Sequence, residues 1–274
     1  MRDFLEDADQ HRDDGYGRAQ HHAKQELPKR FYKEVGVGTV GDGFAVTLDG
    51  RSPRTPGMKP VVVPSEALAQ AMAVEWTAQG GFIDPATMPL VRLVNSGIEA
   101  GDDRVQAFRD EVVKYAGNDL LLYRADAPRE LVAEQERQWD AVLTKVARHF
   151  GVSFQPTMGI VHQAQPAPTL ARLGDVLAGE ALIPLVAMVS LTGITGSGLL
   201  AIALRHGVLT PDEAWTAAHV DEDHNIRLWG EVAEASERRE KRRKDYDAAV
   251  RVLEMMPRQD PDLVVRHAQH EVLM

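Results

Sequence analysis

The stretch from Ala181 to Leu204, ALIPLVAMVSLTGITGSGLLAIAL, contains no charged residue and limits the fold more than any other feature. A run of this length can either cross a bilayer or fill the centre of a globular core. Proline, glycine and hydroxyl residues interrupt it, and neither a basic cluster nor an aromatic belt marks its ends. We therefore predict two buried helical pieces, with TGITGSG (192–198) as a bend or close-packing point between them. A membrane-inserted scaffold is the less favoured alternative.

The first part of the chain, from Arg30 to about Val63, has the composition of strands and turns. RFYKEVGVGTV (30–40) and GFAVTLDGR (43–51) are rich in β-branched and aromatic residues, and the Gly-Asp-Gly between them favours a hairpin turn. A short strand is predicted before Pro64, and Ser65 is a candidate N-cap for a helix that stops at Gly80. A further helix is predicted over 102–117 and a last strand over 119–125.

After Ala127 almost every segment has the period of a helix. Pro128 is suited to a first helical turn, and the helix that it opens is expected to end at Gly151. The pattern predicts the α+β fold class, with a flexible N-terminal arm (1–28) and an α+β domain with a small antiparallel sheet (29–126). An all-helical C-terminal domain (127–274) completes the predicted organisation.

The overall composition limits the classes of partner. A formal net charge of -10 argues against nucleic acid and anionic membranes as partners. The chain has no cysteine, which removes disulfides, thiolate metal sites and thiol nucleophiles, and suits a reducing cytosol. The N-terminal residues lack the apolar run of a secretion signal and the acid-poor character of an organelle presequence. We expect a bacterial cytoplasmic location, or the mitochondrial matrix if the chain is a processed eukaryotic protein.

Motifs for nucleotides, nucleophiles and metals are incomplete in this sequence. GITGSGLL has leucines where a phosphate loop needs Lys and Ser or Thr, and no G-x-S-x-G nucleophile elbow is present. DEDHN (221–225) lacks the glycine of a calcium loop and the Glu-x-x-His spacing of a helical di-metal site. The basic run ERREKRRKD (237–245) alternates with acids, which indicates a solvated face with ion pairs. We therefore expect no cofactor, no metal, no nucleotide and no catalytic residue.

HVDEDHNIRLWGEVAEA (219–235) is the most unusual polar stretch of the chain. On one continuous helix, six residues would share a stripe: Trp215, Ala218, Glu222, Ile226, Trp229 and Ala233. A carboxylate on an otherwise apolar stripe costs stability unless it is paired or reached by solvent. Glu222 is therefore either bonded to a core arginine, histidine or amide, or it meets a partner together with Trp229.

Seven stretches together resemble the family of ATP synthase assembly chaperones that escort the alpha subunit of the F-type ATP synthase head. In order they are RFYK (30–33), LDGRSPRTP (48–56), LAQAMAVEWTAQGGFIDPATMPL (68–90), YAGNDLLLYRA (115–125), QERQWDA (135–141), TGSGLLAIAL (195–204) and DEDHNIRLWGE (221–231). Two places depart from the family pattern. Asp223-His224-Asn225 stands where members usually have an acidic pair followed by an aromatic residue and Gln, and Ala141 stands where they often have Pro.

The resemblance implies a chaperone without a catalytic step. Such a protein would bind the free alpha subunit and shield its subunit interface until the beta subunit replaces it, without ATP hydrolysis. We place the partner-binding residues at Asp221, Glu222, Asp223, Asn225 and Trp229, and the family's acidic residue matches Glu222. The rival hypothesis is a soluble metal-dependent or acid–base enzyme that uses the cluster from Asp221 to His224.

Three tryptophans are predicted to be structural: Trp76, Trp139 and Trp215. Trp76 follows Ala69, Met72 and Ala73 at helical spacing, so its ring is expected to fill the core of the α+β domain. Replacing a fully buried ring of this size would cost about 3–5 kcal/mol of stability.

Overall fold

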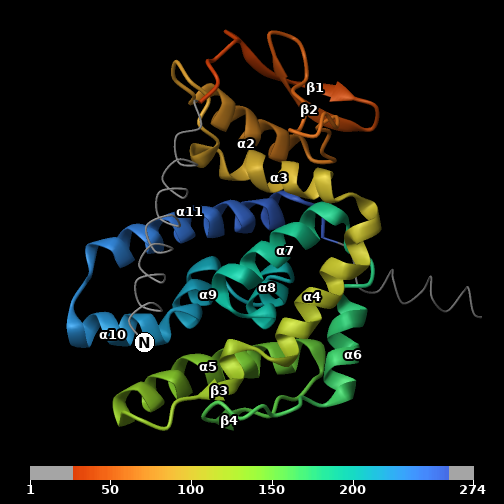
Figure 1. The fold of residues 1–274 in the computed structure, drawn as a ribbon. Coiled ribbons are helices and arrows are strands. Elements are labelled where there is room, and N and C mark those ends of the chain that lie inside the picture. The colour runs from red at the N-terminus through yellow and green to blue at the C-terminus, as the bar shows by residue number, and fades with distance from the viewer. Residues whose placement is uncertain (1–26, 259–274) are drawn as a thin grey trace, which may run out of the picture.

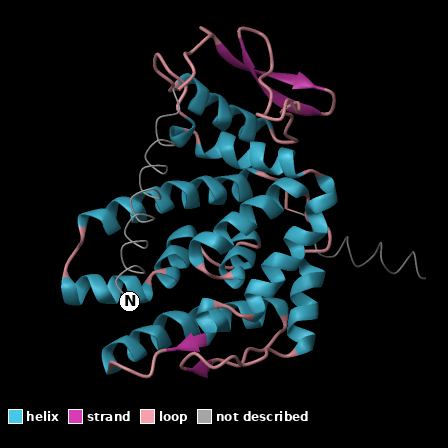
Figure 2. Ribbon diagram, viewed as in Figure 1, coloured by secondary structure: helices cyan, strands magenta, loops and turns pink. Residues whose placement is uncertain are grey.

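The computed structural model describes residues 27–258, in which a small sheet and two helices lie at one end of a larger helical body (Figures 1 and 2). β1 (Val35–Val40) and β2 (Gly43–Leu48) form an antiparallel hairpin around Gly41, which takes a φ of 57°. The predicted α+β class with a small antiparallel sheet is confirmed. The predicted arm, residues 1–28, lies almost entirely outside the described residues.

Two helices support the hairpin. α2 (Glu66–Thr77) starts where predicted, because the Ser65 side chain accepts a hydrogen bond from the backbone N–H of Leu68. α3 (Pro89–Ala100) was not predicted from the sequence. Its N-terminal amides, on Leu90 and Val91, donate to the carboxylate of Glu75 on α2. Because the group that accepts these hydrogen bonds lies on another helix, no N-cap residue in the local sequence marks the start of α3.

Two strand predictions were wrong. The segment before Pro64 forms only a single bridge, between Val63 and Phe44 of β2. The segment over 119–125 opens with a 3-10 turn, η3 (Leu120–Leu122), and only β3 (Tyr123–Arg124) is extended; it pairs in parallel with β4 (Thr157–Met158), away from the hairpin.

Asp119 is the reason for that turn. Its carboxylate is fully buried and accepts hydrogen bonds from the backbone N–H groups of Leu121 and Leu199, which bends the chain and fixes it to the start of α8 (Gly198–Arg205). Burial raises the pKa of Asp119 to about 7, although these hydrogen bonds act in the opposite direction.

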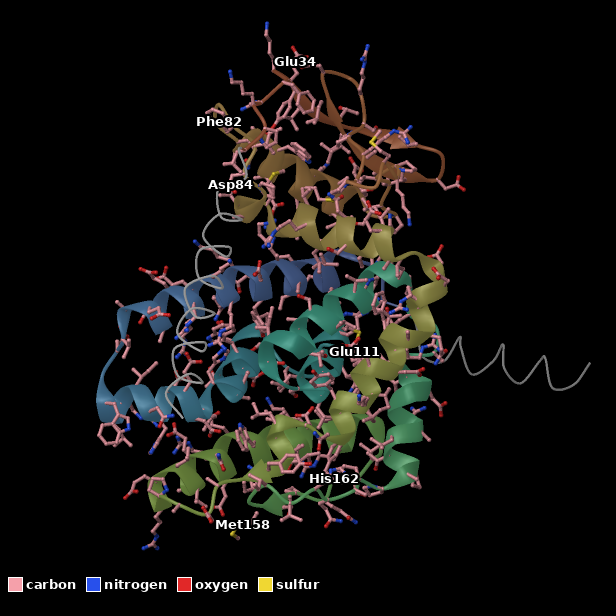
Figure 3. All side chains as sticks on the ribbon, in the orientation of Figure 1. Glu34, Phe82, Asp84, Glu111, Met158 and His162 are labelled. Carbon is pink, nitrogen blue, oxygen red and sulfur yellow. The ribbon has the colours of Figure 1, made fainter. Side chains whose placement is uncertain are left out.

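The larger part of the molecule is helical. Figure 3 shows the whole length of the molecule, with Glu34 and Phe82 at the hairpin end and Met158 and His162 at the other end. Its helices are α4 (Val105–Gly117), α5 (Arg129–Phe150), α6 (Ala167–Val176), α7 (Leu182–Thr195), α8 (Gly198–Arg205), α9 (Pro211–Ala218), α10 (Val220–Trp229) and α11 (Ala233–Met255). Two further 3-10 turns, η1 (Pro85–Thr87) and η2 (Asp102–Arg104), flank α3.

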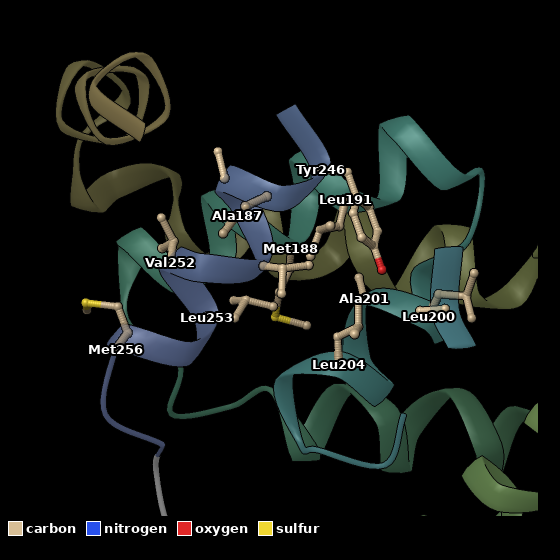
Figure 4. Packing of buried hydrophobic residues seen from close by; sticks show 14 of the residues in the cluster. Ala187, Met188, Leu191, Leu200, Ala201, Leu204, Tyr246, Val252, Leu253 and Met256 are labelled. Atoms are coloured by element: carbon tan, nitrogen blue, oxygen red, sulfur yellow. The ribbon is translucent and has the colours of Figure 1, made fainter. Parts of the chain in front are cut away.

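The uncharged run forms two buried helices, α7 and α8, separated at Gly196 and Ser197. Met188 and Leu191 of α7, Leu204 of α8 and Leu253 of α11 meet in the hydrophobic core (Figure 4). Over residues 27–258, none of the helices combines the length and the apolar character that crossing a membrane requires. The run is therefore core rather than membrane span in this structure.

The predicted domain boundary near residue 126 stays a prediction. α3 and α4 precede it in the chain, yet both pack against α7 (Figure 1). One hydrophobic cluster also runs without interruption from Val46 in the hairpin to Leu253 in α11. Two helices of the predicted first domain thus share the core of the second.

The three tryptophans predicted to be structural differ in burial. Trp139 is fully buried, and its indole N–H donates to the carbonyl of Ala217 at 2.8 Å. Trp215 is also buried. Trp76 is only partly buried: it packs edge-to-face on Tyr32, with ring centroids 5.6 Å apart, at the margin of the core. The expectation that Trp76 fills the core must therefore be corrected, because its position on α2 leaves part of the ring at the surface.

The glycine-rich bend brings α8 against α4, and Gly198 is the closest point. A Cβ at Gly198 would lie 2.3 Å from the carbonyl oxygen of Val112 and 2.7 Å from the backbone nitrogen of Ala116, both on α4. We expect Gly198→Ala to destabilise the fold by about 3 kcal/mol, because backbone atoms of a packed helix cannot move aside locally. Gly193→Ala is the matched control, since nothing lies near its Cβ position. Equal urea midpoints for the two variants would contradict the expectation.

Candidate partner-binding groove

The polar stretch over 219–235 does not form one helix. α9 ends at Ala218 and α10 begins at Val220, and the residue between them, His219, donates from its ring Nδ1 to the carbonyl of Trp215 at 2.8 Å. In a continuous helix, the Trp215 carbonyl would accept a hydrogen bond from the backbone N–H of His219. Here that N–H donates to the carbonyl of Thr216 instead. The prediction of a single stripe on one helix is therefore wrong.

A second break separates α10 from α11. α10 ends at Gly230, which takes a φ of 81°, and α11 starts three residues later at Ala233. The two helices diverge from this short connection like the arms of a hairpin (Figure 1). Between them lies a groove of about 780 Å³.

The groove is lined by apolar side chains, here called its floor, and by polar side chains, here called its rim. Its apolar side chains are Trp215, Ile226, Trp229, Val232 and Ala235. Its polar side chains are Glu222, Asn225, Glu231, Ser236, Arg239, Glu240 and Arg243. Trp215 and Trp229 thus face one space although they belong to different helices.

Trp229 is the most unusual residue of the groove. Its side chain is 83% exposed, and the neighbouring Leu228 and Val232 are exposed as well. Exposed apolar side chains gathered beside a groove are typical of protein-binding surfaces, and tryptophan is enriched among the residues that dominate binding energy.

Ion pairs hold the two walls of the groove together. Arg242 and Arg239 of α11 pair with Glu222 and Asp223 of α10 at 2.7 and 2.6 Å. Arg243 pairs with Asp212 of α9 at 3.0 Å, and its guanidinium lies 5.0 Å from the centre of the Trp215 ring. The basic run was predicted to carry ion pairs, but Arg239 and Arg243 were not predicted as groove residues. The signal that could have found them is an acidic helix and a basic helix joined by a very short connection.

The structure brings together three of the five predicted partner-binding residues: Glu222, Asn225 and Trp229 line the groove. Asp223 lies beside it, paired with Arg239. Asp221 faces the other way, where its carboxylate accepts a hydrogen bond from Gln135 of α5 at 2.7 Å. The assignment of these residues to partner binding stays a prediction.

The side chains from Asp221 to His224 do not converge on one point. Each of the three acids is bonded to a different residue, and His224 is buried. Burial also lowers the pKa of the neighbouring His219, despite its hydrogen bond to Trp215, so this ring is neutral at pH 7. Within residues 27–258, no three His, Asp or Glu side chains come together in a way that could hold a metal ion.

Comparisons with known proteins agree on one family. Residues 29–147 match the model of the ATP12 chaperone protein family. The curated protein atp12, mitochondrial, of Schizosaccharomyces pombe is 22% identical over 221 residues, which cover 76% of each chain.

Two solved structures are more similar still. The crystal structure of a putative chaperone from Agrobacterium tumefaciens has 42% identity and a TM-score of 0.82, and the match covers 88% of this chain and 90% of that one. Atp12 from Paracoccus denitrificans has 33% identity and a TM-score of 0.78, with coverage of 84% and 99%. With this identity over nearly the whole described fold, the chain belongs to the ATP12 family of ATP synthase assembly chaperones.

Proposed function

We propose that this protein binds the free alpha subunit of the F-type ATP synthase head through the groove between α10 and α11. It shields the surface that the alpha subunit presents to the beta subunit, and the beta subunit then displaces it. The cycle requires no ATP hydrolysis by the chaperone. The proposed compartment is the bacterial cytoplasm, with the mitochondrial matrix as the alternative for a processed eukaryotic chain.

The observation that carries this proposal is the exposed Trp229 in the apolar lining of the groove. A free subunit exposes apolar interface that tends to aggregate, and a chaperone must offer apolar surface of its own to cover it. Trp229 supplies such surface, and the side chains of Ile226 and Val232 continue it into the groove.

Glu222 is accessible enough to contact a client. It lies on the groove wall, and its side chain is 31% exposed while paired with Arg242, whose side chain is 43% exposed. An ion pair as open to water as this one contributes at most about 1 kcal/mol to folding. We therefore treat Glu222 as a contact residue rather than as a structural acid.

The test is a capture assay with the alpha subunit. Trp229→Ala should weaken capture about 30-fold, because loss of a tryptophan at the centre of an interface costs about 2 kcal/mol or more of binding free energy. Glu222→Gln should weaken it less and leave the melting temperature nearly unchanged. Both variants are measured by pull-down, by the amount of alpha subunit kept in solution without ATP, and by thermal melting.

Met158→Ala is the matched control for Trp229→Ala. Met158 is also apolar and exposed, but it lies in β4 below α5, whereas α10 lies above that helix (Figures 1 and 3). Full capture by a well-folded Trp229→Ala protein would contradict the proposed site. Loss of capture in Met158→Ala alone would move the client to the β4 side of α5.

A further inference from the structure

We infer that the groove between α10 and α11 binds an amphipathic helix of the client that carries basic side chains beside an aliphatic stripe. This inference rests on the proposed function and specifies the chemistry of the segment that is bound. The charges on the rim, the backbone of the walls and the shape of the floor each contribute to it.

The arginines of the rim have ion-pair partners among the described residues, and two of its glutamates do not. Arg239 and Arg243 already have carboxylate partners, and Arg243 has a second one in Asp247 at 2.8 Å. Glu231 and Glu240 also line the groove, and neither has an ion-pair partner within residues 27–258. The unpaired charge of the rim is therefore negative, which favours lysine or arginine on the segment of the client that binds there.

These two carboxylates lie at different places along the groove. Glu231 belongs to the connection between the helices, and Glu240 lies about two turns into α11. A bound segment with basic residues at two places along its length could reach both.

The walls of the groove are helices, and this decides the backbone form of the bound segment. Strand addition needs a sheet edge with free N–H and C=O groups. The amides and carbonyls in the interior of α10 and α11 are already bonded within each helix, so over most of their length the walls can offer only side chains. Side-chain recognition in an apolar groove is the mode by which amphipathic helices bind.

The floor of the groove favours aliphatic rather than charged side chains. Trp215, Ile226 and Val232 all line it, and the Trp215 ring is buried. Insertion of leucine, isoleucine or valine would bury apolar surface without leaving a polar group unpaired.

The experiment uses the full-length protein and three synthetic peptides of equal length, labelled with fluorescein. The first is an amphipathic helix with a leucine stripe flanked by lysines, the second has glutamates in place of the lysines, and the third is a scramble of the first. Affinities are measured by fluorescence anisotropy at low and high salt. We expect only the lysine peptide to bind, and its affinity should fall as salt rises.

The charge contribution is isolated with the double variant Glu231→Gln/Glu240→Gln. It should bind the lysine peptide about three- to tenfold more weakly and with a smaller salt dependence, as expected for two exposed ion pairs. Glu237→Gln is the matched control, because Glu237 carries the same charge on the same helix but does not line the groove. It should leave the affinity unchanged.

The outcomes separate this inference from the proposed function. Tighter binding of the glutamate peptide, or an unchanged affinity in the double variant, would overturn the inference. If the double variant also captures the alpha subunit as well as the wild type while Trp229→Ala does not, the proposed function stands and only the charge preference is lost. If Trp229→Ala captures the alpha subunit fully, the proposed function itself fails.

Discussion

Arg205→Met should lower the stability of the protein by about 3–5 kcal/mol, because it removes one partner of a buried ion pair. Arg205 is 1% exposed, and its guanidinium donates to the carboxylate of Glu180 at 2.8 Å. It also donates to the carbonyls of Leu253 and Met256 at the end of α11, each at 3.1 Å. Methionine fills similar volume but leaves Glu180 charged in the core and these carbonyls unpaired. Urea denaturation measures the loss.

Two further variants identify the cause of that loss. Arg205→Met/Glu180→Leu should recover part of the stability, because the uncompensated charge is gone, but not all of it, because the carbonyls of α11 stay unpaired. Arg92→Met removes an arginine from a half-exposed pair with Asp245 and should cost less than about 1 kcal/mol. The expectation fails if Arg205→Met and Arg92→Met melt at the same temperature.

Trp139→Ala should cost about 3–5 kcal/mol, the range for removing a large buried aromatic side chain. The ring lies between α5 and the end of α9, where its N–H satisfies the carbonyl of Ala217, and the guanidinium of Arg124 lies 5.1 Å from the ring centre. The substitution therefore leaves a cavity and also removes the hydrogen bond to that carbonyl.

Trp76→Ala provides the comparison for Trp139→Ala. The same atoms are removed, but from a ring that water already reaches, so we expect a cost of about 2 kcal/mol. The hydrogen bond between the Tyr32 hydroxyl and the backbone carbonyl of Trp76 should survive, because it does not involve the side chain. If Trp76→Ala is the more destabilising change in urea, the difference in burial is not what governs the two costs.

Features with local causes could be predicted from the sequence. The Ser65 cap, the hairpin turn at Gly41 and the break inside the uncharged run all depend on residues a few positions apart. These sufficed for the fold class and for most of the helices.

Features with distant causes could not be predicted. The first amides of α3 donate hydrogen bonds to the Glu75 carboxylate of α2. The turn at Leu120 depends on the Asp119 carboxylate, which accepts a hydrogen bond from the backbone N–H of Leu199 in α8. The candidate site shows the same limit. Glu222 and Trp229 were identified as a pair, but on a helix assumed to be continuous, and the break at His219 depends on a side chain that takes the carbonyl of Trp215. The groove arginines were missed because their partners lie on other helices.

α11 has two halves with different neighbours. Its last turns, from Tyr246 to Leu253, bury their apolar side chains in the core. Its first turns, up to Asp245, have no fully buried side chain and meet α9 and α10 through charged groups. Folding and recognition are thus encoded in separate turns of one helix. Residues of the outer turns can change during evolution with little effect on the core, so the groove can adapt to a changing client surface while the chain keeps its fold.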